Sequence, residues 1–335
     1  MNNNEQEIIQ NGSRANNRLL TGIIAIIIVA VVLAIPWLLR ITGVITGETM
    51  SILYNPIQLL PQIPMEEGIE AFNDWLLASI GQYTQFIANI VRNLISDVVD
   101  ALLWIPSFIL MLIITALAWL LANRGVAIFT FIGLLLIHNM GYWEGSMDTI
   151  TLIIASVLIS ICVGLPVGIL STRSDLVHKI VWPILDFMQT MPAFVYLIPA
   201  VFFFRIGTAS AMIAVIVFSM PPVVRLTGLG IRQVSQEVVE AASAFGATDW
   251  QKLIKVQLPL AKPTIMAGIN QCIMLALSMV VIAAMIGAGG LGASVLRGIQ
   301  RMDIGMGFAA GLAVVIVAII LDRITQSSKT TSEEE

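Results

Sequence analysis

The chain has 335 residues, of which 58% are hydrophobic and 11% charged, and its formal net charge is −4. Soluble globular domains carry roughly a quarter charged residues, so this composition excludes that class. Apolar stretches long enough to cross a bilayer recur along the sequence, which predicts an all-α polytopic membrane protein. Both cysteines fall inside predicted spans and the two histidines form no ligand cluster, so neither a disulfide nor a metal site is expected. Nothing in the composition points to nucleic-acid binding.

The N-terminal third begins with residues 1–18, which are polar and predict a disordered tail. Residues 19–39 form an apolar run of 21 residues, which predicts an additional transmembrane helix. A cleaved signal peptide is the competing interpretation, but the core is too long and lacks a clear small-residue cleavage site. Residues 40–105 predict a loop followed by an amphipathic helix, because apolar residues from Ile69 to Leu102 recur at steps of three or four. Charged residues interrupt this helix, so it is expected to pack on the protein surface or to lie flat on the bilayer.

Residues 106–321 predict one transmembrane domain, and residues 322–335 a short tail. The expected spans in this domain are Ser107–Leu121, Val126–Met140, Ile150–Leu170, Leu185–Phe204, Ala209–Val224, Thr264–Ile286 and Ile304–Leu321. A polar loop, Ser171–Lys179, is expected before the fourth of them. With residues 19–39 the total is eight, and the short gap between Leu121 and Val126 leaves seven as the alternative.

Orientation follows from the lysines and arginines. With a cytoplasmic N-terminus, twelve of the 17 basic residues fall in cytoplasmic segments and five fall outside. This distribution predicts cytoplasmic N- and C-termini and an extracytoplasmic segment at residues 40–105.

A polar interruption, Glu237–Pro259, separates two apolar spans and is predicted to be cytoplasmic. Ser235 can start a helix there, and Gly246 can end that helix in a left-handed conformation. Thr248 with Gln251 three residues later forms a capping box, which predicts the start of a second helix. The segment therefore reads as a helix-turn-helix between two membrane spans.

Two further features shape this segment. Pro259 and Pro263 are expected to prevent the second helix from running straight into the next span. The small residues Ala241, Ala242 and Ala244 leave one face of the first helix flat, which suits docking into a groove of another protein.

Helix-breaking and polar residues also occur within the spans. Pro166, Pro192, Pro199 and Pro221-Pro222 are expected to interrupt helices, and such breaks are tolerated where freed backbone groups line a cavity. Candidates for the lining of a path for a polar solute are Gln189, Thr190, Pro192, Asn270, Gln271 and Ser278. Hydrogen bonding between helices is the alternative role for the polar members of this set.

Three familiar nucleotide or ligand signatures carry little weight. Residues 287–292 match G-x-G-x-x-G, but they follow a membrane helix and not a strand, so they predict a helix-ending turn with close backbone packing. No Gly-Lys-Ser or Gly-Lys-Thr occurs, so the chain has no visible phosphate-binding loop for ATP hydrolysis. Most tryptophans fall near span ends, where an aromatic belt is expected, and they form no evident cage for a quaternary ammonium group.

The spacing within Glu237–Pro259 is distinctive. Glu240-Ala241-Ala242 is followed after three residues by Gly246, and after nine more by Val256-Gln-Leu-Pro259. This pattern resembles the EAA motif of ABC importer permeases, with Val256 where the family has isoleucine. Further stretches resemble the glycine betaine/proline betaine permease subfamily, and they are Leu185–Pro199, Met220–Thr227, Lys255–Gly268 and Leu275–Ala283.

The resemblance implies a MetI-like, type I importer permease in a bacterial or archaeal inner membrane. It would be the transport subunit of an ATP-driven, binding-protein-dependent importer of glycine betaine, proline betaine or related quaternary ammonium compounds. Its implied partners are a second copy, two cytoplasmic ATPase subunits that hold ATP and Mg²⁺, and an extracytoplasmic solute-binding protein. The chain itself would be no enzyme and hold no cofactor. The implied ATPase-coupling residues are Glu240, Ala241, Ala242, Gly246, Leu258 and Pro259.

Two alternatives remain. A permease of the same architecture could carry choline, carnitine or an amino acid. A self-contained secondary transporter is the other, and it predicts inverted repeats that the sequence does not display.

Overall fold

The computed structural model describes residues 65–327. The predictions for residues 1–18, 19–39 and 40–64, and for the last residues of the tail, lie outside this part of the chain. The chain divides into two compact units, Met1–Asp74 and Trp75–Glu335. The arrangement below is that of the second unit.

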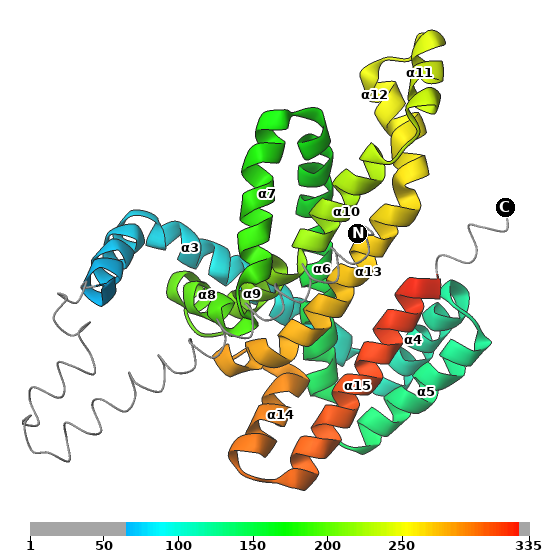
Figure 1. Cartoon of the computed structure of the whole chain (residues 1–335). Helices are drawn as coiled ribbons and strands as arrows, with labels where there is room; N and C mark the ends of the chain where they lie inside the picture. Colours follow the sequence, from blue (N-terminus) through cyan, green and yellow to red (C-terminus); the bar gives the residue numbers. More distant parts are fainter. Residues whose placement is uncertain (1–64, 328–335) are drawn as a thin grey trace, which may run out of the picture. The chain divides into compact units, whose positions relative to one another are not determined.

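All regular secondary structure in residues 65–327 is helical (Figure 1). The elements are α3 (Met65–Trp104), α4 (Ser107–Leu121), α5 (Arg124–Asn139), α6 (Trp143–Arg173), α7 (Asp175–Thr190), η2 (Ala193–Tyr196), α8 (Leu197–Phe204), α9 (Thr208–Ser219), α10 (Pro221–Arg232), α11 (Gln236–Ala244), α12 (Asp249–Lys252), η3 (Leu253–Gln257), α13 (Leu258–Ala283), η4 (Ala284–Ile286), α14 (Gly290–Gln300) and α15 (Ile304–Ser327). The predicted amphipathic helix is confirmed as a helix, since α3 contains Ile69 through Leu102.

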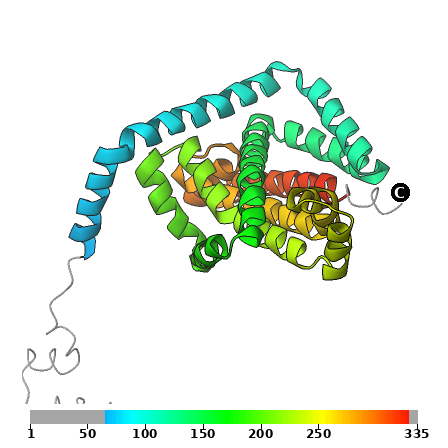
Figure 2. The ribbon, with the colours of Figure 1, turned by 90° about the horizontal axis from the view of Figure 1, so that it is seen from above.

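Helix α6 lies at the centre of the second unit, and Figure 2 shows it between α7–α9 on one side and α13 and α15 on the other. It contacts α5, α7, α9, α10, α13, α14 and α15. Small residues permit this close approach, as is usual between membrane helices. A Cβ at Gly164 would lie 3.0 Å from Val223 Cγ1, and one at Gly168 would lie 2.8 Å from the Val224 carbonyl oxygen.

Two groups of buried apolar side chains hold the helices together. The larger group joins α6, α9 and α13 and includes Met212, Val215 and Met279. The second joins α5, α6 and α15 and includes Leu134 and Val317. Lipid tails are as apolar as these side chains, so the helices are stabilised chiefly by close van der Waals packing.

Four of the predicted spans are confirmed as parts of helices long and apolar enough to cross a membrane. These helices are Trp143–Arg173, Thr208–Arg232, Asp249–Ile286 and Ile304–Gln326. They contain the predicted spans at residues 150–170, 209–224, 264–286 and 304–321. The chain is therefore an all-α polytopic membrane protein.

The span predicted at Leu185–Phe204 is present as a bent helix pair and not as one continuous helix. Helix α7 ends at Thr190, and the chain bends by 114° between α7 and the segment Ala193–Phe204. The residue before a proline disfavours the α conformation, and Met191 has an extended ψ of 136° just before Pro192. The prediction of a polar loop at Ser171–Lys179 is wrong, because only Ser174 separates α6 from α7.

The count of seven spans in this part of the chain is too high. Helices α4 and α5 have 15 and 16 residues. At 1.5 Å per residue each is about 23 Å long, less than the roughly 30 Å hydrocarbon core. Counting each bent helix pair, α3–α4 and α7–α8, as one span gives at most six within the described residues.

The predicted interruptions at the prolines are confirmed only in part. Pro192 lies at the bend after α7, as expected. Pro166 instead lies inside the continuous helix α6, because one missing N–H is tolerated where neighbouring helices pack closely. Pro221 and Pro222 begin α10, where a helix needs no N–H partner, and α9 and α10 together form one 25-residue span.

The glycine turn at residues 287–292 is confirmed as a close-packed helix end. Gly290 has a φ of +66°, and a Cβ there would lie 2.5 Å from Thr149 Oγ1. The N-terminal end of α14 thus lies directly against the start of α6. The helix α14 itself was not predicted.

The close packing of α6 on α10 can be tested by adding a methyl group at the contact. Gly168→Ala should lower the free energy of unfolding by about 1–3 kcal/mol, because its Cβ would lie 2.7 Å from Thr227 Cβ and 2.8 Å from a backbone oxygen. The matched control is Gly311→Ala in α15, where no atom lies within 4 Å of the added Cβ. It should gain about 0.5–1 kcal/mol from helix propensity. Thermal unfolding of the purified protein in detergent measures both, and shifts of equal sign would contradict the packing described.

Candidate functional site

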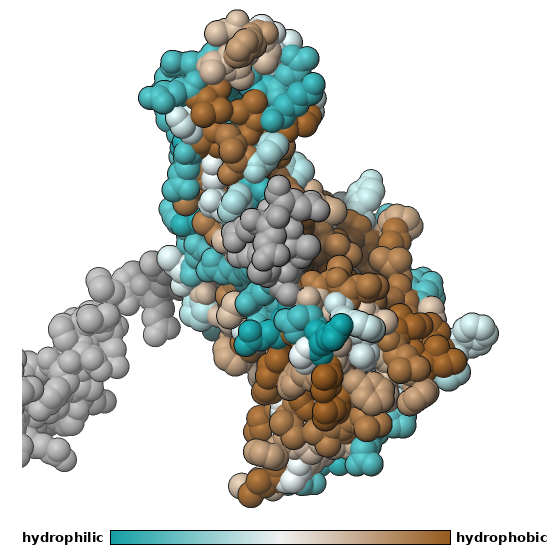
Figure 3. All heavy atoms as spheres, turned by 90° about the vertical axis from the view of Figure 1, so that its right-hand side faces the viewer, coloured by the Kyte–Doolittle hydropathy of each residue, from teal (hydrophilic) through white to brown (hydrophobic). Residues whose placement is uncertain are grey.

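A pair of short helices, α11 and α12 (the helix pair, residues 235–252), projects from the end of the second unit at which α6 and α10 terminate (Figure 1). No side chain of α11 is buried. Phe245, which follows α11, is 93% exposed, and Trp250 in α12 is 67% exposed. Both hydrophilic and apolar side chains cover the projecting part, whereas apolar side chains dominate the body below it (Figure 3). Large exposed apolar side chains on a projecting element are typical of a protein interaction surface.

The turn between the two helices forms as the sequence predicts. Helix α11 follows Ser235 and ends at Ala244. Gly246 has a φ of +81°, and its N–H donates to the Ser243 carbonyl at 2.9 Å. The next N–H, from Ala247, donates to the Ala242 carbonyl at 3.1 Å. This is a glycine-dependent helix end, since residues with a Cβ rarely adopt that φ.

The second helix begins with the predicted capping box. The Gln251 N–H donates to Thr248 Oγ1 at 3.3 Å, and the Thr248 N–H donates to Gln251 Oε1 at 2.9 Å. Both local predictions for the helix pair are therefore confirmed, because caps of this kind depend only on residues three positions apart.

The prediction that Pro259 and Pro263 stop the second helix is wrong. Helix α12 passes through the single π-helical turn η3 into α13, and the helix is continuous over the 38 residues from Asp249 to Ile286. Leu258 N–H donates to the Leu253 carbonyl, five residues back. Pro259 follows directly, where the backbone hydrogen bonds change from the π pattern, five residues back, to the α pattern, four residues back. The N–H that proline lacks therefore falls where the hydrogen-bond pattern changes. The helix pair is thus joined to α13 without an intervening loop.

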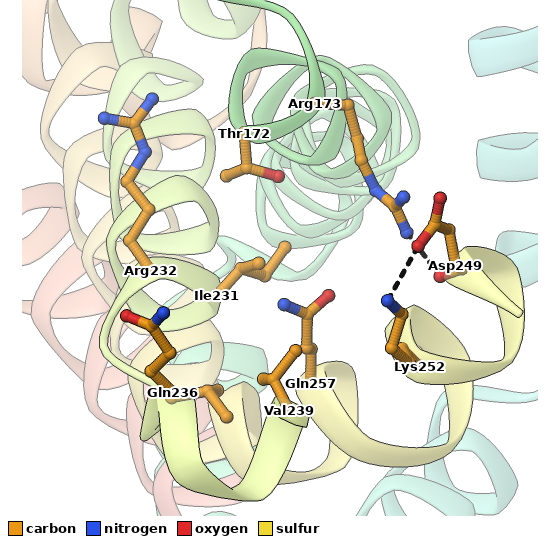
Figure 4. Close-up of a pocket in the computed structure, with 10 residues that line it drawn as sticks. Thr172, Arg173, Ile231, Arg232, Gln236, Val239, Asp249, Lys252 and Gln257 are labelled. Atoms are coloured by element: carbon orange, nitrogen blue, oxygen red, sulfur yellow. Dashed lines mark hydrogen bonds and ion pairs between the residues drawn. The ribbon is translucent and has the colours of Figure 1, made fainter. Parts of the chain in front are cut away.

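A hollow of about 420 Å³ lies between the helix pair and the ends of α6 and α10 (Figure 4). Its lining residues are Thr172, Arg173, Ile231, Arg232, Val234, Gln236, Val239, Asp249, Lys252 and Gln257. Most of these side chains are polar, so the hollow is suited to water and not to an apolar ligand.

Polar contacts across the hollow hold the helix pair in place. Arg173 Nη2, at the end of α6, donates to the Asp249 carbonyl at 2.7 Å. Lys252 Nζ lies 2.8 Å from Asp249 Oδ1 and 3.1 Å from Ser243 Oγ, which links α12 to α11. Contacts of this kind at an exposed surface are weak, so they position the helix pair without fixing it rigidly.

A cluster of basic and aromatic residues lies at the same end of the unit. Arg232 Nη2 donates to the Ser171 carbonyl at 3.0 Å and lies 2.9 Å from His178 Nδ1. The Arg232 guanidinium also lies 6.0 Å from the Trp182 ring. These contacts join the end of α10 to α6 and α7, beneath the helix pair.

The predicted coupling residues fall into two groups. Glu240, Ala241 and Gly246 are exposed on the helix pair, where Gln236 Nε2 donates to Glu240 Oε1 at 2.8 Å. Ala242 is half-buried beside them. Leu258 and Pro259 lie beyond the π turn at the start of α13, and Leu258 packs against the buried cluster formed by Ile231, Leu253 and Ala261.

The residues predicted to line a path occupy two separate places. Gln189, Thr190 and Pro192 are exposed at the bend after α7, and Thr190 Oγ1 donates within its own helix to the Phe187 carbonyl at 3.1 Å. Gln271 and Ser278 are exposed on α13, where Ser278 Oγ donates to the Met274 carbonyl at 3.0 Å. Asn270 is half-buried, and its Oδ1 has no hydrogen-bond partner. No hydrogen bond joins the two groups within residues 65–327.

Sequence reasoning did not identify the link from Arg173 to Asp249. The two residues lie 76 positions apart. The sequence places Arg173 near the end of one helix and Asp249 near the start of another. Nothing in the sequence indicates that those two helix ends lie side by side.

Comparison with known proteins places these features in context. The family described as "Binding-protein-dependent transport system inner membrane component" matches residues 164–328. The glycine betaine transport system permease protein OpuAB of Bacillus subtilis is 53% identical over 270 residues, which span 81% of this chain and 96% of that protein. The glycine betaine/carnitine transport permease protein GbuB of Listeria monocytogenes is 51% identical over 82% of this chain and 99% of that protein.

A more distant relative and a solved structure are also similar. The glycine betaine/proline betaine transport system permease protein ProW of Escherichia coli is 44% identical over 79% of this chain and 75% of that protein. An inward-facing structure of the MetNI methionine ABC transporter has a TM-score of 0.49 and 23% identity, covering 58% of this chain and 94% of that one. The relatives confirm the resemblance inferred from the EAA spacing. Since this chain matches nearly the whole length of two proteins at more than half identity, it belongs to the family of binding-protein-dependent transport system inner membrane components.

Proposed function

We propose that this chain is the transmembrane permease subunit of an ATP-driven, binding-protein-dependent importer of osmoprotectants such as glycine betaine and proline betaine. The observation that carries the proposal is the similarity over nearly the full length of relatives named for glycine betaine transport. ATP and Mg²⁺ bind to two partner ATPase subunits. A solute-binding protein delivers the substrate from outside, and two copies of this chain form the pathway.

The charge of the substrate explains why the permease needs an ATPase partner. Glycine betaine is a zwitterion without net charge, so the membrane potential gives it no direct push. Accumulation against a gradient therefore needs energy from ATP hydrolysis on a partner chain. Because the hydrolysis occurs elsewhere, the coupling to this chain is mechanical.

Basic residues support a cytoplasmic position for the helix pair. Arg173, Lys179, Arg232, Lys252 and Lys255 belong to helix ends around it. At the opposite end of α6, which contacts α14, the basic residues are Arg205, Arg297 and Arg301. The larger basic group faces the cytoplasm by the positive-inside rule. Both termini are cytoplasmic in this proposal, as the distribution of lysine and arginine along the whole sequence predicts.

The helix pair is the surface on which the ATPase acts. Glu240, Ala241, Ala242 and Gly246 form the contact and its turn, and the exposed Phe245 inserts into the partner. When ATP closes the ATPase dimer, the helix pair moves with it. The continuous helix from Asp249 to Ile286 passes this displacement to the membrane spans, and Leu258 and Pro259 anchor it at the membrane surface.

The solute path runs along exposed polar positions of the spans. Gln189, Thr190 and Pro192 line it at the bend after α7, and Asn270, Gln271 and Ser278 line it along α13. Exposure of Gln271 and Ser278 on one helix face fits a surface that a second copy completes across the path.

Reconstitution tests the proposal. The chain, its ATPase and its binding protein in proteoliposomes should accumulate radiolabelled glycine betaine only when ATP is inside. Excess proline betaine should compete, and competition by choline, carnitine or an amino acid alone would assign the substrate to that solute instead. Ion-driven uptake without ATP or partners would contradict the proposal and favour a secondary transporter.

Gly246→Asp should abolish transport and weaken ATPase binding while the protein still reaches the membrane. An aspartate at a φ of +81° costs about 1–3 kcal/mol, so the turn rearranges and the helix pair presents a different surface. Gly141→Asp is the matched control, since Gly141 is exposed, has a φ of +79° and has open space at its Cβ position, but lies in the turn between α5 and α6. Co-purification of the ATPase and uptake are the two measurements. Normal uptake by Gly246→Asp, or equal loss in both variants, would show that the turn has no special role in coupling.

A further inference from the structure

A second cavity lies away from the helix pair, among α7, η2, α8 and α9. Its volume is about 290 Å³, close to the lower end of the roughly 300–1,000 Å³ typical of small-molecule sites. The principal side chains that line it are Phe187, Met188, Met191, Tyr196, Phe203 and Phe204. The cavity thus combines four aromatic rings with two polarisable thioethers, and no charged residue is among its lining residues.

Tyr196 provides a polar group in this apolar lining. Its side chain is only 3% exposed, and its Oη is buried without a hydrogen-bond partner among the described residues. The ring is fixed by an edge-to-face contact with Phe218, at 5.5 Å between ring centroids. A buried hydroxyl without a partner costs free energy, so a hydrogen-bond acceptor that reached Tyr196 Oη would be stabilised there.

The cavity lies where a membrane helix is broken. Met191 is extended before Pro192, and the chain bends by 114° there. Irregular backbone at membrane depth is tolerated where it is buried in protein or lines a cavity, and broken helices commonly form solute sites in transporters. Two of the residues predicted to line the solute path, Gln189 and Thr190, directly precede Met191.

We propose that this cavity is a substrate site within the permease, which receives the quaternary ammonium group of a methylated zwitterion during transport. The inference rests on the proposed function. Aromatic faces attract a quaternary ammonium group by cation–π interaction, and thioether sulfurs are soft, adaptable neighbours for its methyl groups. The Tyr196 hydroxyl donates to the carboxylate of the same molecule.

The absence of charge among the lining residues sets the specificity. A bare cation or anion in an uncharged, apolar cavity loses its hydration without a compensating ion pair. A zwitterion also loses hydration at its ammonium and carboxylate groups, but it carries its own counter-charge, which compensates part of that cost. A lipid acyl chain would fill the apolar space, but it would leave the Tyr196 hydroxyl without a partner.

The sequence predicts no aromatic cage for a quaternary ammonium group, because most of the tryptophans lie near span ends. The cluster found here consists of phenylalanine and tyrosine residues from 187 to 204, within one of the stretches that resemble betaine permeases and just beyond it. The 114° bend at Pro192 brings them together; the interruption at Pro192 was predicted, but its angle and the resulting cluster were not.

Uptake by the complete transporter in proteoliposomes tests the site. Tyr196→Phe removes only the hydroxyl, and Phe203→Leu replaces a ring by an aliphatic side chain. Each should lower the maximal rate of glycine betaine uptake about tenfold, the order expected for one desolvated cation–π contact or hydrogen bond. The affinity of the binding protein and the co-purification of the ATPase should not change. Phe308→Leu is the matched control, because Phe308 is 75% exposed on α15, and it should transport at the wild-type rate.

Direct binding separates cation recognition from simple apolar binding. Radiolabelled glycine betaine should bind to the purified transporter without its binding protein, and the carbon isostere 3,3-dimethylbutyrate should fail to compete. Equal competition by the isostere, or wild-type uptake by both cavity variants, would overturn the inference. If the wild-type transporter shows no ATP-dependent uptake of glycine betaine, the proposed function fails instead, so the two failures are distinguishable.

Discussion

The unbroken helix from Asp249 to Ile286 is the constraint on which the rest of this structure depends. Its first turn carries the exposed helix pair, and its remainder packs in the core against α6, α9 and α10. A loop at Pro259 would have absorbed any displacement of the helix pair. The π turn at Leu253–Gln257 instead keeps the backbone helical past Pro259, so no loop separates the helix pair from α13.

Close contacts between small residues make that helix an effective lever. A Cβ at Gly268 of α13 would lie 2.9 Å from the Pro222 carbonyl oxygen of α10, and one at Gly230 of α10 would lie 3.2 Å from the Ala261 carbonyl oxygen of α13. With backbones this close, α13 cannot shift without moving α10 and, through Gly168, α6. Polar contacts at the helix pair are few and exposed by comparison. The structure thus combines a tightly packed set of spans with a weakly held helix pair, as the proposed mechanical coupling requires.

The parts of the fold that depend on near neighbours in sequence were predictable. The caps at Gly246 and Thr248, the amphipathic helix α3 and four of the spans all follow from residues within a few turns of one another. Features that depend on packing were not. The helix continues past Pro259 because a π turn shifts its register, and the 114° angle at Pro192 does not follow from the sequence, although the interruption there does. Likewise, the Arg173–Asp249 contact and the cavity beside Tyr196 exist only because distant segments meet.

The central claim is that the helix pair is where the ATPase acts on this chain. A photo-crosslinking amino acid placed at Phe245, and separately at Phe308 as a control, measures this in the assembled transporter. Illumination should attach the ATPase subunit to the residue at position 245 and not to that at 308, with the yield changing between nucleotide-free and ATP-bound states. A transport-competent complex in which position 245 captures no ATPase subunit would contradict the account.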